Sequence, residues 1–502
     1  MSRQPIANLL FVLALSAGLA GCAHRLPAAE RVPSFAVAAT DDTPLARIAS
    51  RELAGSPADH SALHLLRGGK EALAARLALI ERAQRSVDVQ YYIWRADASG
   101  QLMATALRRA AERGVRVRLL LDDWGSRPTE AELGLLAAHP NVEVRLFNPL
   151  PLRWALTLGM LLDFERGNRR MHNKALVADN QAAIVGGRNV GDEYFESRRE
   201  FVFSDVDALA LGPVVRQVSK GFDAYWNSVD AVPVAPGDAT APAPERQIDE
   251  ALHESVASTG FAQRLDGGTL PFQAGRALAL YDFPEKVDPT ASRDARPGLG
   301  RQIAAVVAEP GSELLLVSAY FVPGAGGVEQ LRGFRSRGVR VVAVTNSLAA
   351  TDVPAVHGGY ARYRKPLLEG GVELYEIRAD AQETAARNPR RPGSSRVSLH
   401  AKLMVIDRRV TFIGSMNIDP RSVALNTENG IVFESAEMGE AIASGIRRAL
   451  GESAYRLEID GGALRWRGGA DGREVLESEP GASLWLRLKT RFMSWLAIEE
   501  LL

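Results

Sequence analysis

The residues whose types and spacing could do chemistry form two copies of one motif, H-x-K-x4-D. The first copy runs from His172 through Lys174 to Asp179, and the second runs from His400 through Lys402 to Asp407. The chain has only 8 histidines in 502 residues, so two copies are not expected by chance. The repeated spacing indicates that both copies serve one chemical function.

An asparagine follows each motif after a turn of small residues. Asn189 comes behind Gly186-Gly187, and Asn417 comes behind Gly414-Ser415. Small residues allow backbone to approach a ligand closely, and the two amides can donate hydrogen bonds beside each histidine.

These residue types suit displacement at a phosphodiester. One histidine can act as the nucleophile while the other protonates the departing alcohol. Lysines and asparagine amides can neutralise the negative charge that builds up on the equatorial oxygens. This chemistry requires no metal and no organic cofactor, so we expect neither.

Each motif is predicted to lie on a β-strand. Apolar runs follow both lysines, and residues two apart on a strand share a face, so each histidine points the same way as its lysine. Asp179 and Asp407 end these strands. We expect them to hold the turn and the lysine strand rather than to transfer protons.

Other segments repeat in the same order. Residues 86–94 match 313–321 as strands, and residues 141–146 match 371–376. Between them, residues 106–123 and 331–347 each predict a helix, a glycine stop at Gly114 or Gly338, and a buried strand. Strands that alternate with helices predict an α/β sheet covered on both faces, once per half.

The repeats divide the chain into segments. We expect a signal peptide at 1–21, a tether and short helix at 22–60, a first domain at 61–231, a Pro- and Ala-rich linker at 232–250 and a second domain at 251–451. The extension at 452–502 predicts a β-hairpin at 455–467, turning at Asp460-Gly461-Gly462, and an amphipathic helix.

Composition narrows the function classes. Lys and Arg number 60 against 60 Asp and Glu, so the chain lacks the basic excess that nucleic-acid binding normally uses. The phosphate-binding loop G-x4-G-K-[ST] and the serine elbow G-x-S-x-G do not occur, which disfavours nucleotide hydrolysis and serine esterase chemistry. The single cysteine, Cys22, excludes an intramolecular disulfide and any multi-cysteine metal site.

The N-terminus predicts export and lipid anchoring. Arg3 precedes an apolar run at 9–20 that is too short to span a bilayer, and Leu19-Ala20-Gly21-Cys22 resembles a bacterial lipoprotein box. We therefore expect a periplasm-facing protein of the cell envelope, anchored through Cys22, with an ordinary secretory signal as the alternative. The residue after Cys22 is Ala23 and not the aspartate that usually signals inner-membrane retention, so the choice between inner and outer membrane stays open.

Two further stretches could contact lipid. Residues 150–164 are apolar and precede the first motif, although a buried core helix is equally compatible. The tail places apolar side chains at helical intervals beside cations, which is typical of membrane-surface helices and also of helices that cover their own domain. These tail residues are Leu484, Arg487, Leu488, Lys489, Arg491, Phe492, Trp495 and Leu496.

The double motif resembles the phospholipase D superfamily. Residues 90–94, 170–174, 319–323 and 495–502, with the lipoprotein signal, are together similar to the bacterial cardiolipin synthases of the C type, and the resemblance covers nearly all of 43–502. It implies two phospholipase D-like α/β sandwich domains related by a pseudo-twofold axis, with both motifs at their interface. It also implies a phosphohistidine on one histidine and proton transfer by the other, and we favour His172 as the nucleophile.

The resemblance further implies an acidic residue, about thirty positions after each motif, that orients the histidine. Glu428 fits in the second half. In the first half the constant offset points to Glu200, whereas the pattern Phe203-Ser-Asp205-Val-Asp207 points to Asp205, which we prefer.

We therefore expect a membrane-tethered phosphatidyltransferase that makes cardiolipin from phospholipids. Phosphatidylglycerol is the expected substrate, with phosphatidylethanolamine as a second candidate. The open alternatives are a phospholipase D that hydrolyses phospholipids, a metal-independent nuclease or phosphodiesterase, and a lipoprotein scaffold with a relic site. The need for an accessory protein and the oligomeric state also stay open.

Overall fold

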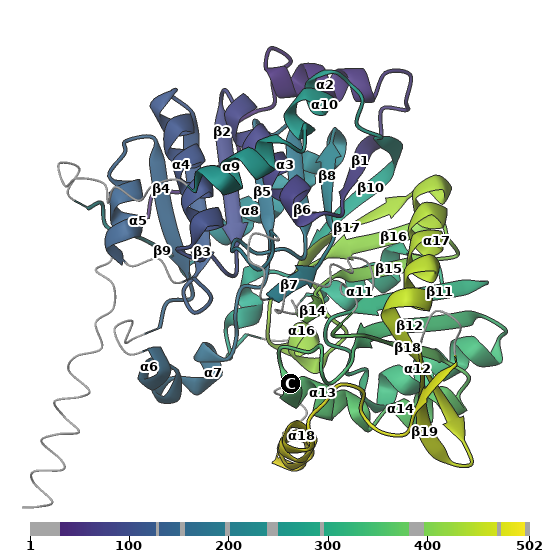
Figure 1. The fold of residues 1–502 in the computed structure, drawn as a ribbon. Helices are drawn as coiled ribbons and strands as arrows, with labels where there is room; N and C mark the ends of the chain where they lie inside the picture. The colour runs from purple at the N-terminus through teal and green to yellow at the C-terminus, as the bar shows by residue number, and fades with distance from the viewer. Residues whose placement is uncertain are drawn as a thin grey trace, which may run out of the picture.

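The computed structural model describes residues 31–126, 130–150, 156–195, 201–237, 249–291, 296–380, 396–468 and 473–496. Figure 1 shows two α/β halves that meet along a shared sheet. The expected signal peptide, Cys22, Glu200 and residues 238–248 of the expected linker lie outside the described residues.

The first half contributes eight strands to this sheet. From the outer edge to the centre they are β9 (Ala231–Pro233), β4 (Val142–Phe147), β3 (Arg116–Asp122), β2 (Ser86–Tyr91), β5 (Ala175–Ala178), β6 (Ala182–Gly186), β8 (Asp207–Leu211) and β1 (His60–Leu66). Strands β2, β3 and β4 are parallel, and the others pair antiparallel.

The second half repeats this order from the centre outward. Its strands are β10 (Gln273–Tyr281), β17 (Asn429–Glu434), β16 (Val410–Gly414), β15 (Lys402–Ile406), β11 (Glu313–Ser318), β12 (Arg340–Asn346), β13 (Glu373–Ile377), β18 (Ala454–Asp460), β19 (Ala463–Gly468) and β20 (Glu474–Leu476). The halves join where β1 and β10 pair antiparallel, with Ala62 opposite Ala274. The reversed order is what a twofold axis between β1 and β10 produces, so the predicted fold class is confirmed.

Helices pack on the sheet of each half. Those of the first half are α2 (Pro44–Glu52), α3 (Gly69–Arg82), α4 (Ala98–Glu112), α5 (Glu130–Ala137), α6 (Leu156–Leu162), α7 (Phe164–Gly167) and α8 (Pro213–Trp226), followed by α9 (Glu250–Ala257) and α10 (Phe261–Asp266). Those of the second half are the 3-10 helix η2 (Pro284–Val287) and α11 (Leu299–Val306), α12 (Gly324–Ser336), α13 (Pro354–Ala361), α14 (Arg364–Glu369), α16 (Pro420–Ala424), α17 (Ala436–Ser453) and α18 (Leu484–Leu496).

The local sequence explains these elements. All six residues of β2 and of β11 are buried, as expected for strands covered on both faces. Gly114 (φ 92°) and Gly338 (φ 87°) follow the C-terminal caps of α4 and α12, at positions where only glycine adopts a left-handed backbone without strain. One apolar core spans both halves, because Leu63 and Val215 of the first half belong to the same cluster as Val344 and Phe433 of the second.

The described residues shift two expected boundaries. Residues 231–233 form β9 and pair with β4, so the first half continues beyond residue 231. Leu252, Val256, Phe261 and Leu265 of α9 and α10 belong to the core around α3, although we expected the second domain to start at 251. The chain returns to the first half after the linker because α3 needs apolar cover, and the second half starts at β10.

The extension contains the predicted hairpin. Strands β18 and β19 pair antiparallel with Asp460 opposite Ala463, and Gly461 and Gly462 both have positive φ, as a tight two-residue turn requires. Helix α18 follows as the expected tail helix. Over the described ranges, none of the helices is both long enough and apolar enough to cross a membrane.

Candidate active site

The first motif is held in place by the second half. The backbone N–H of His172 donates to the Thr427 carbonyl at 2.9 Å, and the N–H of Thr427 donates to the Arg170 carbonyl at 3.0 Å. The N–H of Lys174 donates to Asn429 Oδ1 at 3.0 Å. Because these contacts join residues far apart in sequence, the position of His172 depends on both halves.

The second motif is held by the first half in the corresponding way. Strands β7 (Phe201–Ser204) and β14 (Arg396–Leu399) pair parallel, with Leu399 opposite Ser204. The N–H of His400 donates to the Ser204 carbonyl at 2.8 Å. Each motif is therefore anchored on the opposite half, and both lie at the interface, where the resemblance places them.

Each histidine also takes its carboxylate partner from the opposite half. His172 Nδ1 lies 2.8 Å from Glu428 Oε2, and His400 Nδ1 lies 2.6 Å from Asp205 Oδ2. Asp205 is the first-half acid that we preferred over Glu200. An ionised carboxylate holds the imidazole proton on Nδ1, which leaves the Nε2 lone pair as the reactive position of each ring.

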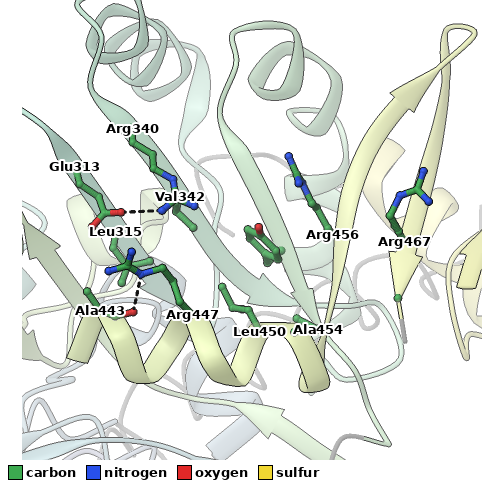
Figure 2. Close-up of a pocket in the computed structure, with 13 residues that line it drawn as sticks. Glu313, Leu315, Arg340, Val342, Ala443, Arg447, Leu450, Ala454, Arg456 and Arg467 are labelled. Carbon is green, nitrogen blue, oxygen red and sulfur yellow. Dashed lines mark hydrogen bonds and ion pairs between the residues drawn. The ribbon is translucent and has the colours of Figure 1, made fainter. Parts of the chain in front are cut away.

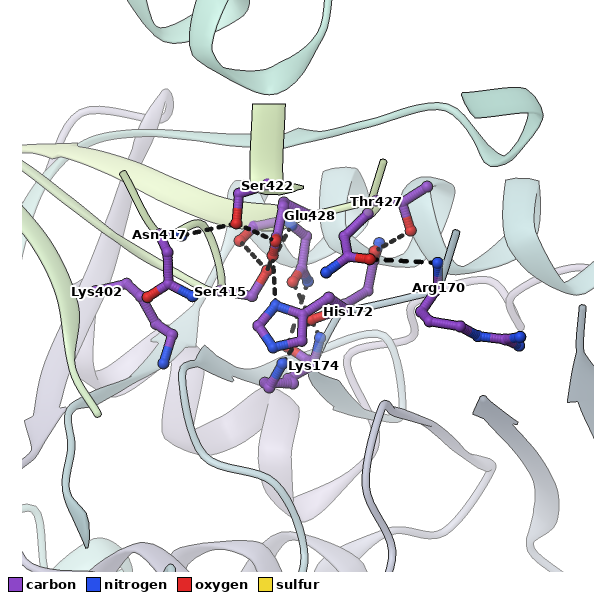
Figure 3. A network of polar contacts seen from close by, with 12 residues as sticks. Arg170, His172, Lys174, Lys402, Ser415, Asn417, Ser422, Thr427 and Glu428 are labelled. Atoms are coloured by element: carbon purple, nitrogen blue, oxygen red, sulfur yellow. Dashed lines mark hydrogen bonds and ion pairs between the residues drawn. The ribbon is translucent and has the colours of Figure 1, made fainter. Parts of the chain in front are cut away.

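The two lysines complete the pairing. Lys174 Nζ donates to the His172 carbonyl at 2.6 Å, and Lys402 Nζ donates to the His400 carbonyl. Figure 3 shows Lys402 and Asn417 of the second half beside His172 and Lys174 of the first. The charge of Lys402 acts on His172, and that of Lys174 acts on His400, so the two motifs form one electrostatic unit.

Burial disfavours the protonated forms of the histidines and lysines in this site. Burial, reinforced by the two lysines, lowers the pKa of His172 well below its usual value and lowers the pKa of His400 to about 4. Burial also lowers the pKa of Lys402 and lowers the pKa of Lys174 to about 7. A bound phosphodiester anion would restore the charged forms, so the site is suited to such a group.

The two carboxylates are not equivalent. Glu428 accepts hydrogen bonds from Ser415 Oγ and, at 2.8 Å, from Ser422 Oγ, and burial raises the pKa of Glu428 to about 7. Burial would also raise the pKa of Asp205, but the opposing charges of His400, Lys402 and Arg188 outweigh it and lower that pKa. The imidazolium form is therefore better supported at His400 than at His172.

A glycine explains part of this difference. A Cβ atom at Gly187 would lie 2.4 Å from Asp205 Oδ1, which is too close for any side chain. The corresponding place in the second half is taken by Ser415, whose hydroxyl binds Glu428. The two halves therefore differ at this position, glycine in the first and serine in the second, and the serine gives Glu428 a hydrogen bond that Asp205 lacks at the corresponding place.

The aspartates of the motifs support strand ends. Asp179 accepts the backbone N–H groups of Gln84, Arg85 and Ser86, the last of which starts β2. Asp407 does the same for Gly311, Ser312 and Glu313 at the start of β11. These contacts agree with the turn-holding role that the sequence predicts and engage both carboxylates away from the histidines.

The two asparagines border the site. Asn189 Oδ1 accepts the backbone N–H of Ile93 at 3.2 Å, which fixes the side chain and leaves its amide as a donor. The backbone N–H of Asn417 donates to Ser422 Oγ at 3.2 Å. The Asn417 side chain is buried beside Lys402 (Figure 3).

Two tyrosines beside the histidines were missed by the sequence analysis as site residues. The ring of Tyr92 lies edge-on to His172 with centroids 5.1 Å apart, and Tyr194 lies edge-on to His400 at 5.3 Å. Tyr92 falls in the segment 90–94 that carried the family resemblance, so a signal for it existed. Tyr194 had none, because Ser422 occupies the corresponding place in the second half.

Two cavities differ in their position relative to this site. Figure 2 shows one of about 280 Å³ on the second half, lined by Arg340, Arg447, Arg456 and Arg467 but by no motif residue. Another, of about 530 Å³, borders the site, because Arg169 and Ser422 contribute to its wall. In the part of the chain that the structure describes, no group of three or more His, Cys, Asp or Glu side chains is placed to hold a metal ion.

The repeated site and its two α/β halves define a phospholipase D-type enzyme, and comparison with known families agrees. The family model described as "Cardiolipin synthase, PLD-like domain" matches residues 77–226 and 304–449. Each match contains one motif with one of the two carboxylates. The chain therefore belongs to the phospholipase D-like cardiolipin synthase family and is a phosphatidyltransferase of that class, as the resemblance implied.

Individual relatives narrow the likeness. Cardiolipin synthase C of Escherichia coli (strain K12) is 40% identical over 450 residues, which cover 86% of this chain and 94% of the relative. Cardiolipin synthase B of the same strain is 24% identical over 396 residues, covering 79% of this chain and 82% of the relative. The crystal structure of phosphatidylserine synthase from Haemophilus influenzae Rd KW20 matches 88% of this chain and 95% of its own with a TM-score of 0.57 at 13% identity, which supports the fold.

Proposed function

We propose that this phosphatidyltransferase synthesises cardiolipin from two phospholipids through a phosphohistidine. The observation that carries the proposal is the crossed pairing of His172 with Glu428 and of His400 with Asp205 in one lysine-rich site. The similarity to cardiolipin synthase C supports cardiolipin as the product.

In the first step, His172 Nε2 attacks the phosphorus of the donor phospholipid. A nitrogen–phosphorus bond forms, the bond from phosphorus to the head-group oxygen breaks, and the protonated His400 gives its proton to that oxygen. Lys174 and Lys402 balance the negative charge of the transition state. The head-group alcohol then leaves.

In the second step, the reaction runs in the opposite sense with a new alcohol. Neutral His400 accepts the proton of a hydroxyl on the acceptor phospholipid, and the hydroxyl oxygen attacks phosphorus. The nitrogen–phosphorus bond breaks and His172 is regenerated. Because His400 must be protonated in one step and neutral in the next, its ionised partner Asp205 suits the acid–base role, which leaves His172 as the nucleophile.

The chemistry of the acceptor favours phosphatidylglycerol. Its glycerol head group carries the free hydroxyl that the second step needs, so two phosphatidylglycerol molecules would give cardiolipin and glycerol. Phosphatidylethanolamine is a second candidate donor, because its phosphatidyl group can be transferred with release of ethanolamine. We include in the proposal an anchor on Cys22 in the cell envelope, supported by the sequence at 19–22, with the membrane and any accessory protein left open.

Product analysis tests this function. Vesicles of phosphatidylglycerol labelled in the acyl chains are incubated with the enzyme, with and without phosphatidylethanolamine, and the lipids are separated. We expect labelled cardiolipin, and none with His172→Ala or His400→Ala. Phosphatidic acid as the main product would show that water is the acceptor and would contradict cardiolipin synthesis.

A further inference from the structure

Helix α18 presents an apolar stripe to the outside. Leu484, Trp485, Leu488 and Phe492 are 71%, 74%, 54% and 61% exposed. At about 100° per residue, their spacing places all four within a sector of about 100° on one side of the helix. Large apolar side chains seldom cluster on a solvent-exposed surface, and where they do, the cluster usually marks an interaction site.

The opposite side of α18 fixes the helix to the protein. Thr490 is buried, Leu486 and Arg487 are half-buried, and the helix packs on α13. The exposed cations Lys489 and Arg491 lie on either side of the apolar stripe. The four apolar side chains of this stripe are therefore not buried against their own domain, while the side chains of Trp495 and Leu496 lie outside the described residues.

A second exposed apolar group lies on the first half. Leu158 and Leu162 of α6 and Phe164 of α7 are 43%, 64% and 47% exposed. In Figure 1, α6, α7 and α18 all project at the lower edge of the molecule, on the side opposite α2 and α10. The apolar stretch before the first motif therefore contributes to the surface as well as to the core.

Both groups are tied to the catalytic site. Helix α7 leads into Asn168, which accepts two hydrogen bonds from Arg421 of α16 at 2.7 and 2.8 Å, and His172 follows four residues later. Helix α18 packs on α13, and Asp352, just before α13, accepts a hydrogen bond from Tyr320 and acts by its charge on Lys402. Each apolar group is thus connected to one motif.

We propose that α18 and the α6–α7 segment form one docking surface for an anionic phospholipid bilayer, so that both lipid substrates enter the site from the membrane. The proposal rests on the proposed function for its substrates. Leucine, tryptophan and phenylalanine flanked by lysine and arginine are the composition of helices that lie in the lipid interface. A protein partner would leave unexplained why the cations border the stripe on both sides.

A fluorescent depth probe tests the surface directly. In the full chain carrying Cys22→Ser, an environment-sensitive label is attached through Leu488→Cys and, as a matched control, through Val475→Cys, which replaces a 45%-exposed valine of β20. With phosphatidylglycerol-containing vesicles that carry nitroxide lipids, we expect quenching at position 488 and none at 475. Equal quenching, or none at 488 because the face is shielded in a dimer, would overturn the proposal.

Activity measurements separate docking from catalysis. The variant Leu484→Ser/Trp485→Ser/Leu488→Ser should have a transfer activity on vesicles at least tenfold below that of wild type. Its activity on monomeric short-chain phosphatidylglycerol should stay within twofold of wild type. Val475→Ser should be unchanged on both substrates. Unchanged vesicle activity of the triple variant would overturn the proposal, whereas quenching at 488 by an enzyme that makes no cardiolipin would reject only the proposed function.

Discussion

His172 and His400 hold the same position in the repeated motif but have different partners in the folded chain. The Glu428 carboxylate accepts hydrogen bonds from two serine hydroxyls as well as contacting His172. The Asp205 carboxylate instead contacts His400 and is stabilised in its ionised form by the charges of His400, Lys402 and Arg188. The residue types and their spacing indicate phosphodiester displacement at both motifs, which remains a prediction. They could not predict the partner of each histidine, because an offset along the chain does not report contacts between the halves.

The low pKa of Lys174, about 7, makes anion binding depend on pH. A bound anion favours the charged lysine and raises its pKa, so above pH 7 binding must bring a proton with it, and affinity falls as pH rises. Sulfate does not titrate in this range. Calorimetry should show the sulfate Kd rising by roughly 10- to 100-fold from pH 7 to pH 9.

Lys174→Met provides the control for this pH dependence. Its sulfate affinity should be weaker at pH 7 and should vary less between pH 7 and pH 9, since the Lys174 ammonium, whose pKa is about 7, is gone. A wild-type affinity that is constant over this range would contradict the assigned role of the lysines.

At the scale of elements, most strands and the terminal hairpin follow from local patterns. Strands β2, β3, β11 and β12, the glycine stops at Gly114 and Gly338 and the turn at 461–462 stand where the sequence predicts them. The location of α9 and α10 could not be predicted, because their apolar faces fit either half and only packing on α3 decides between them.

Asp179 is expected to stabilise these elements rather than to take part in catalysis. Asp179→Ala leaves three buried or partly buried backbone N–H groups without their acceptor and places alanine at a φ of 52°, so it should lower the free energy of unfolding by about 2–4 kcal/mol. Thermal unfolding measures this loss. The kcat of the folded fraction should stay within about tenfold of wild type, and a loss as large as that of His172→Ala would argue for a catalytic aspartate instead.

At the scale of the whole molecule, two repeated halves make one asymmetric site. The resemblance predicted the pseudo-twofold arrangement, and the strand order across β1 and β10 reproduces it. The exchange of backbone and carboxylate contacts between the halves gives a reason for fusing them in one chain, because neither half holds a complete histidine–acid pair.

The crossed pairs predict which step each acid controls. Glu428→Gln and Asp205→Asn should each lower turnover of natural lipids by about 10²- to 10⁴-fold, because the histidine loses its tautomer and orientation. With a phosphatidyl p-nitrophenol substrate, the leaving group needs no proton. The rate of the first step should therefore return toward the wild-type rate in Asp205→Asn but not in Glu428→Gln. Stopped-flow release of nitrophenol measures this step.

A buried carboxylate outside the site serves as the matched control. Glu376 binds Arg364 and Trp466 in the second half. Glu376→Gln should reduce thermal stability without changing the ratio of turnover on natural lipids to turnover on phosphatidyl p-nitrophenol. If the rate of nitrophenol release recovered in Glu428→Gln and not in Asp205→Asn, the roles of the two histidines would be reversed.

The most direct test of the central claim is to locate the covalent intermediate. His400→Ala is mixed with phosphatidyl p-nitrophenol, quenched, digested and mapped by mass spectrometry; without the base for the second step, the adduct should accumulate. We predict a phosphatidyl group on His172, and none in the protein carrying His172→Ala. An adduct on another residue, or nitrophenol release without any adduct, would contradict the account.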